Sequence, residues 1–214
     1  MKRIAIVFAL LTAAHMTFPS NASAQLSDYL KRNFQHRLAI FGGSSIPVGP
    51  FMQKTPADPN AGYANLSFVA GIEYTALRLN GGIGLAATLT GSTYSVSMLP
   101  GGATGSHYTV LSAMVGPRFE VGLVSPTPVS LYCQGQAGAI YSKSPDATIG
   151  TTVVRGGNDV SFGVSVGGGA VLDRVVDFGV RYFYTEARFG TNRLSVDPKT
   201  RIEGIQATVG IFIL

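Results

Sequence analysis

Several charged residues of this 214-residue chain occur in segments where every second residue is apolar, and this spacing limits the chemistry open to them. If these segments are β-strands, the charges project from the face opposite the apolar one. Charges that are enclosed with little water need partners of opposite sign. We therefore predict an interior network of ion pairs and hydrogen bonds. Its members, three cationic and three anionic, are Arg37, Glu73, Arg118, Glu120, Asp177 and Arg181.

A catalytic set is a weaker interpretation of the remaining polar residues. Ser106, His107 and Glu186 have the side-chain types of a nucleophile, a base and an acid. Adjacent residues of a strand point to opposite faces, so Ser106 and His107 would be turned away from one another. We therefore expect no enzyme activity, and a lipid-modifying enzyme is the least favoured alternative.

Metal, cofactor and nucleic-acid sites are not indicated either. No group of His, Cys, Asp and Glu residues has metal-ligand spacing, and the pairs Gly101-Gly102 and Gly156-Gly157 match no phosphate-binding fingerprint. The Lys and Arg residues are scattered, without the runs typical of nucleic-acid binding. Cys133 is the single cysteine, so an intramolecular disulfide is impossible. Its place in an alternating segment indicates a buried or lipid-facing thiol.

Eight segments with a period of two would position these residues. The clearest reads VVDFGVRYFYTEARF and has an apolar or aromatic residue at every second position from Val176 to Tyr184. This alternation is typical of a strand with one apolar face. The predicted strands are Arg37–Ile46, Tyr63–Leu77, Gly82–Thr93, Tyr108–Val121, Pro128–Tyr141, Asp159–Leu172, Val175–Phe189 and Arg201–Leu214.

The connections between these segments alternate in length. Those at 47–62, 94–107, 142–158 and 189–200 are long and rich in Gly, Pro, Asn and Asp, whereas those near 78–81, 122–127 and 173–174 are short. Long loops at one end and tight turns at the other are typical of an outer-membrane barrel. An even number of strands places both termini at the end with the short turns.

Composition and the N-terminal segment favour an exported membrane protein. A basic start, an apolar stretch and the tripeptide Ala22-Ser23-Ala24 predict a signal peptide over residues 1–24. Without Lys2 and Arg3 the chain has 14 basic and 11 acidic residues, a modest net charge of +3. Only 13% of the residues are charged, yet no segment after Gln25 approaches the roughly 20 apolar residues of a membrane helix. A closed β-barrel is the other structure that can span a bilayer.

The predicted fold is therefore all-β, an eight-stranded antiparallel up-and-down transmembrane β-barrel. Residues 25–35 are expected to form a short periplasmic segment, and residues 36–214 the barrel. The apolar faces would contact lipid, and the six charges would lie in the lumen. In the alternative fold, a soluble ligand-binding barrel, the apolar faces would point inward.

The chain resembles the small outer-membrane β-barrel family of Gram-negative bacteria, related to the OmpA transmembrane domain and OmpX. The resemblance rests on Phe41–Phe51, Tyr63–Ala76, Val115–Gly122, Val176–Glu186 and Val209–Leu214. It implies a bacterial outer-membrane location, contact with outer-membrane lipid and lipopolysaccharide, and the barrel-assembly machinery as a partner in biogenesis. It implies no shared catalytic residues. The chain departs from the family's C-terminal aromatic residue, because it ends in Leu214 with Phe212 two positions earlier.

Aromatic residues near the strand ends are expected to form belts at the membrane interfaces. They are Tyr63, Tyr74, Phe119, Tyr141, Tyr182 and Tyr184. Small residues in the outer half of the lumen predict room there for water or a narrow cavity. These include Gly84, Ala86, Gly163, Ser165 and Gly167.

These patterns predict a monomer with a structural or surface-contact role, whose long loops are the candidate surface for an extracellular partner and whose lumen is closed by the charge network. An eight-stranded lumen is wide enough for side chains or one small ligand. A narrow, low-conductance pore or a carrier of a small ligand is therefore the alternative.

Overall fold

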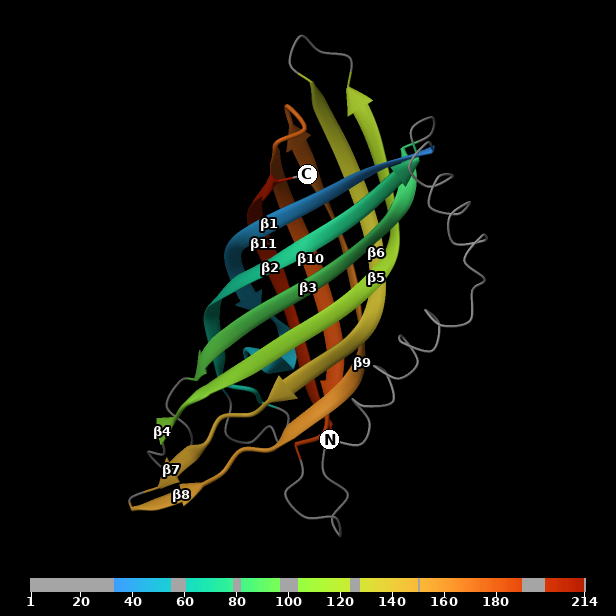
Figure 1. The fold of residues 1–214 in the computed structure, drawn as a ribbon. Helices are drawn as coiled ribbons and strands as arrows, with labels where there is room; N and C mark the ends of the chain where they lie inside the picture. Colours follow the sequence, from blue (N-terminus) through green and yellow to red (C-terminus); the bar gives the residue numbers. More distant parts are fainter. Residues whose placement is uncertain are drawn as a thin grey trace, which may run out of the picture.

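Eight long strands close into an antiparallel barrel in the described part of the chain (Figure 1). The computed structural model describes residues 33–54, 61–78, 82–96, 104–123, 128–149, 151–189 and 199–213. The predicted signal peptide lies outside these residues. The barrel strands are β1 (Phe34–Pro47), β2 (Ala64–Arg78), β3 (Ile83–Val96), β5 (His107–Leu123), β6 (Val129–Lys143), β9 (Asn158–Leu172), β10 (Val176–Ala187) and β11 (Thr200–Phe212).

Each barrel strand pairs with its neighbours in chain order, and β1 closes the barrel by pairing with β11 from Ala39↔Phe212 to Pro47↔Gly204. The eight predicted strands and the up-and-down order are thus confirmed. Proline within a strand removes a ladder donor. In agreement, Gly116 and Pro117 of β5 have no paired residue on β6. Pairing resumes at Arg118 in the same register as before Gly116.

The predicted boundary between an N-terminal segment and the barrel is two residues too late. Phe34 pairs with Arg78 and Gln35 pairs with Leu77, so both already belong to β1. The alternating pattern is weak there, but backbone pairing continues beyond it.

The two ends of the barrel differ, and we call them the turn end and the loop end. Short connections after β2, β5 and β9 lie at the turn end, together with the start of β1 and the end of β11. The loop end carries the long connections. Two of them contribute short strands to a separate sheet in the order β4-β7-β8, formed by β4 (Thr104–Gly105), β7 (Ala147–Ile149) and β8 (Thr152–Val154). Figure 1 shows this sheet extending beyond the barrel wall.

The outer wall of the barrel is apolar. Side chains at alternate positions are exposed, and the exposed fraction of Phe162 is 71%. Others that face outward include Leu66, Ile72, Leu89, Val115, Leu131, Val164, Val180 and Val209. Strands with this alternation place their remaining side chains inside. Within the described residues, no helix is long and apolar enough to cross a bilayer.

Candidate functional site

The interior of the barrel is filled by an apolar cluster at the loop end, a small cavity and a charged layer toward the turn end. The apolar cluster is built around Phe51, which belongs to the short 3-10 helix η1 (Gly49–Phe51) and is fully buried. Its ring contacts Tyr94 and Tyr108 edge-on, with centroids 5.0 and 5.1 Å apart. Other members are Ala64, Val110, Met114, Ile140, Phe183, Ala187 and Ile202.

This cluster reduces the room expected for water or a narrow cavity in the outer half to one small cavity among the described residues. The inward positions near the loop end carry Tyr94, Tyr108, Val110 and Met114, which are large and apolar enough to fill the lumen. The segment after β1 adds Phe51. Two of the small residues expected there, Gly84 and Ala86, lie near the start of β3 and therefore closer to the turn end.

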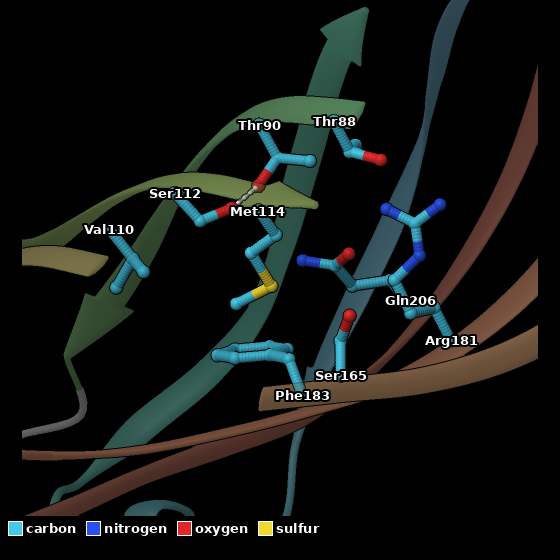
Figure 2. A pocket seen from close by; sticks show the side chains of 9 residues that line it. All are labelled: Thr88, Thr90, Val110, Ser112, Met114, Ser165, Arg181, Phe183 and Gln206. Carbon is cyan, nitrogen blue, oxygen red and sulfur yellow. Dashed lines mark hydrogen bonds between the residues drawn. The ribbon is translucent and has the colours of Figure 1, made fainter. Parts of the chain in front are cut away.

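A cavity of about 10 Å³ separates the apolar cluster from the charges. That volume holds about one water molecule. Figure 2 shows its polar lining, with Ser165, Gln206 and Arg181, and its apolar lining, with Val110, Met114 and Phe183. The Ser165 hydroxyl is buried and has no hydrogen-bond partner among the described residues. The cavity could therefore offer polar contacts to a water molecule but has no room for a continuous water column.

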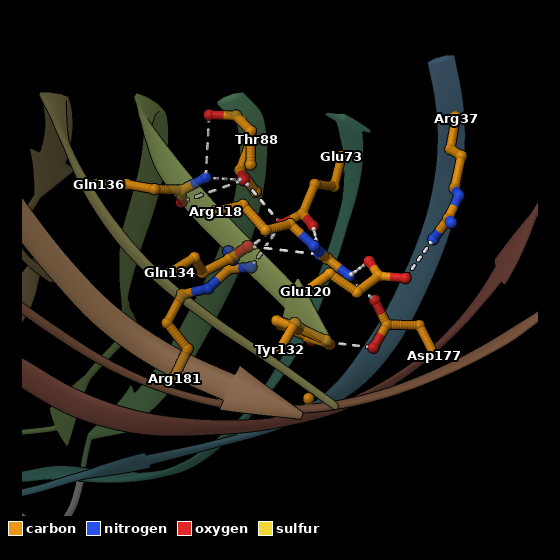
Figure 3. A network of polar contacts seen from close by, with 12 residues as sticks. Arg37, Glu73, Thr88, Arg118, Glu120, Tyr132, Gln134, Gln136, Asp177 and Arg181 are labelled. Carbon is orange, nitrogen blue, oxygen red and sulfur yellow. Dashed lines mark hydrogen bonds and ion pairs between the residues drawn. The ribbon is translucent and has the colours of Figure 1, made fainter. Parts of the chain in front are cut away.

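Arg118 lies at the centre of the charged layer and is completely buried (Figure 3). Its Nη1 lies 2.6 Å from Glu73 Oε1, and its Nη2 lies 3.4 Å from Glu120 Oε2. Asp177 Oδ2 is 4.0 Å from Nη1. The guanidinium also stacks over the Tyr132 ring at 3.6 Å from the centroid, a favourable cation–π distance. One cation on β5 thereby contacts acids on β2, β5 and β10.

Glu73 is the acid with the most partners. Its Oε2 accepts hydrogen bonds from Arg181 Nη2 at 2.7 Å, Gln134 Nε2 at 3.0 Å and Thr88 Oγ1 at 3.0 Å. Gln136 extends the chain of contacts, because its Nε2 donates to Thr88 Oγ1 at 2.8 Å. These bonds supply the partners that a buried carboxylate requires.

The remaining charges complete the layer toward the turn end. Arg37 Nη1 donates to Glu120 Oε1 at 2.8 Å, and the Ser130 hydroxyl donates to the same oxygen at 2.8 Å. The Tyr132 hydroxyl donates to Asp177 Oδ1 at 2.9 Å. All six residues proposed from the sequence thus lie together inside the barrel, as three carboxylates and three guanidinium groups.

Several neutral members of this layer were not singled out by the sequence. Their inward orientation follows from the period of two, but they carry no charge that would distinguish them from other lumen residues. The signal that could have found them is their position beside the charges on adjacent strands. These members are Thr88, Ser130, Tyr132, Gln134 and Gln136.

The predicted interface aromatics are on the outer wall with one exception. Tyr74 and Phe119 are exposed, while Tyr141, Tyr182 and Tyr184 are half-buried there. The placement of Tyr63 was wrong, because this residue precedes β2, has a φ of 54° and is only 8% exposed. Its position near a strand end was a poorer guide than the period of two, because Tyr63 shares the inward parity of Ser67 and Glu73.

The structure does not bring the candidate catalytic residues together. The Ser106 hydroxyl accepts a hydrogen bond from the Asp146 backbone N–H at 2.9 Å. Glu186 forms an ion pair with Lys199 at 2.8 Å and accepts a hydrogen bond from Tyr184. Among the described residues, no contact joins His107 to either one, and no group of three His, Cys, Asp or Glu residues could hold a metal ion. The Cys133 thiol is exposed on the outer wall.

The fold defines the class of protein as a small, closed, eight-stranded antiparallel β-barrel with an apolar exterior. Membrane barrels have this arrangement, with apolar residues outside and polar residues inside. No protein-family model matches the chain, and no curated protein matches it.

Solved structures do match. Ail, the attachment invasion locus protein of Yersinia pestis, has a TM-score of 0.50 at 14% identity, covering 85% of this chain and 99% of that one. Neisserial surface protein A has a TM-score of 0.44 at 12% identity, covering 83% of this chain and 95% of that one. At these identities the likeness to Ail shows the fold alone.

Proposed function

We propose that this protein is a closed outer-membrane β-barrel whose role is structural or depends on contacts at its surface. The observation that carries the proposal is the fully buried Arg118, held by ion pairs in a lumen whose outer half is packed around Phe51. The cavity between the charge pairs and the apolar cluster has space for about one water molecule. Such an interior supports a stable scaffold better than a pore.

The proposal includes export by the N-terminal signal peptide, assembly by the barrel-assembly machinery and membership of the OmpA- and OmpX-related barrels. The apolar outer wall supports contact with lipid, because a soluble barrel would not expose so much contiguous apolar surface. Lipopolysaccharide would then surround the loop end. The protein would act as a monomer.

The loop end is the proposed contact surface. The β4-β7-β8 sheet projects from the barrel there. Val153 lies on β8, an edge strand of this sheet, and is 60% exposed. A short sheet that projects beyond the barrel, formed by two surface connections, is the type of feature that a partner at the cell surface could bind. The name of Ail as an attachment and invasion protein is in keeping with such a role.

Cysteine labelling in intact cells tests both orientation and exposure. Cys133 is first replaced by Ser, and single cysteines are introduced as Val153→Cys at the loop end and Arg174→Cys at the turn end. A membrane-impermeant maleimide should label the Val153→Cys protein in intact cells, and the Arg174→Cys protein only after the outer membrane is permeabilised. The reverse pattern, or equal labelling of both, would contradict the proposal.

Single-channel recording separates the closed barrel from the narrow pore. The reconstituted wild-type protein should show no steady openings in planar bilayers. Steady openings that change in size with Arg118→Ala would instead identify a conducting lumen lined by the charged layer.

A further inference from the structure

A hollow of about 390 Å³ opens at the turn end of the barrel, on the side of the charged layer that faces away from the apolar cluster. Ligand-binding pockets commonly have volumes of this size. Three arginines line it, Arg37, Arg78 and Arg174, together with the single acid Glu120. Each arginine comes from a different element, namely β1, β2 and the turn before β10.

The acid in the hollow is already neutralised. Glu120 Oε1 accepts hydrogen bonds from Arg37 and Ser130, each at 2.8 Å, and its Oε2 lies 3.4 Å from Arg118. Arg78 and Arg174, by contrast, have no ion-pair partner among the described residues. Within the described part of the chain, two guanidinium groups at this site are therefore left without a counter-charge.

A third guanidinium has unused donor capacity. Arg37 is 7% exposed, and its Nη atoms are bound to Glu120 and Gln35, yet its Nε is buried without a hydrogen-bond partner. The buried Nε is closed off from the hollow, but each Nη carries a second N–H. Arg37 therefore keeps donor capacity beside the hollow that it lines.

The conformation of Arg174 is a separate observation. Asp173 and Arg174 are the two central residues of the turn Leu172–Val175 between β9 and β10, with φ values of 50° and 58°. Turns of this kind favour Asn-Gly or Asp-Gly, because glycine adopts positive φ without strain. An arginine at the glycine position is strained, and strained residues concentrate at functional sites. Hydrogen bonds from Asp173 N to Pro128 O and from Val175 N to Leu172 O fix the backbone of the turn.

From these observations we propose that the turn-end hollow binds an oxyanion, a carboxylate or a phosphate, through Arg78, Arg174 and Arg37. Guanidinium groups bind both anions with paired, charge-assisted hydrogen bonds. The site goes beyond the proposed surface role and does not depend on it. The anion could be a soluble molecule or the phosphate of a lipid headgroup, since both present the same chemistry.

Titration of the purified barrel in phosphate-free maltoside micelles tests the site, with inorganic phosphate and succinate as probes and calorimetry as the readout. We expect saturable binding of at least one probe. Arg78→Gln and Arg174→Gln should each weaken it about tenfold, as expected when one charge-assisted contact is lost. Arg155→Gln and Arg188→Gln at the loop end are the matched controls and should bind normally.

Two outcomes would overturn the proposal: no saturable binding, or an equal loss in the control variants. A heat-dependent shift in gel mobility shows for each variant that the barrel is folded. Once binding is seen in micelles, the titration is repeated in phospholipid nanodiscs. If succinate or phosphate still binds there, the natural ligand is a soluble anion; if binding is lost, the lipid phosphate fills the site.

Discussion

Arg181 on β10 and Glu73 on β2 join two separate parts of the barrel wall, with 2.7 Å between Nη2 and Oε2. Neither strand neighbours the other, because β10 pairs with β9 and β11, and β2 pairs with β1 and β3. The contact therefore crosses the lumen. Glu73 also binds Arg118 on β5, so that a single carboxylate connects three separate parts of the wall.

Glu73→Gln should strongly destabilise the barrel. The substitution keeps the size of the side chain but leaves Arg118 and Arg181 without their shared acid, and breaking a buried ion pair in this way costs about 3–5 kcal/mol. Urea unfolding in phospholipid vesicles measures the loss. Glu186→Gln is the matched control, because Glu186 pairs with Lys199 at the exposed loop end. If the two substitutions lowered the free energy of unfolding equally, the interior ion pairs would stabilise the barrel no more than an exposed ion pair does.

Phe51→Ala should also destabilise the folded barrel, although Phe51 lies outside the strands. Its ring is fully buried between Tyr94 and Tyr108, and removal of a buried phenyl ring costs roughly 3 kcal/mol or more. Met52→Ala provides the comparison, since Met52 is the next residue and is 50% exposed. Thermal or urea unfolding of both variants should separate them clearly. If Phe51→Ala and Met52→Ala were equally stable, the apolar cluster around Phe51 would not be what holds η1 at the loop end of the barrel.

The sequence was sufficient to predict the strands and their faces because every strand of a closed barrel has one outer and one inner side. The period of two therefore recurs in each barrel strand that the structure describes, as at Leu66 in β2 and Val209 in β11. Strand ends were less certain. β3 continues to Val96 and β5 to Leu123, because hairpin pairing does not stop where the apolar alternation stops.

The filling of the outer lumen was harder to predict. Alternation assigns Tyr94, Tyr108 and Phe183 to the interior but does not say that they meet there. That meeting depends on the stagger of the strands around the barrel and on Phe51, which comes from a connection. The short strands β4, β7 and β8 have two or three residues each, too few for a period to be recognised.

Val115→Lys tests whether the outer wall contacts lipid. Val115 lies at the middle of β5, and its side chain is on the exposed face. A lysine at the midplane of a membrane barrel costs about 2–4 kcal/mol, whereas a lysine on a water-exposed strand costs little. The free energy of unfolding in vesicles should therefore fall for Val115→Lys and stay close to wild type for Val153→Lys at the loop end. Equal stability of the two would indicate a wall that faces water.

The Cys133 thiol offers a test that needs no substitution. It is exposed on the outer wall of β6, between Leu131 and Gly135. In phospholipid vesicles a charged, water-soluble maleimide should therefore modify it very slowly, while a lipid-soluble maleimide should react readily. Unfolding in urea should abolish the difference. Rapid reaction of the folded protein with the charged reagent would place Cys133 in water and contradict the lipid-facing assignment.

Arg174→Gly should stabilise the barrel and weaken anion binding at the same time. A non-glycine residue in the left-handed region costs roughly 1–2 kcal/mol, so relief of this strain should raise the free energy of unfolding by about 1 kcal/mol. Asp173→Gly should gain less, because aspartate tolerates positive φ better than arginine does. Urea unfolding and anion titration on the same protein give both quantities. If Arg174→Gly were more stable than wild type but bound the anion with full affinity, the Arg174 side chain would not take part in anion binding. A destabilised one would show that the arginine side chain supports the fold through contacts at the turn end.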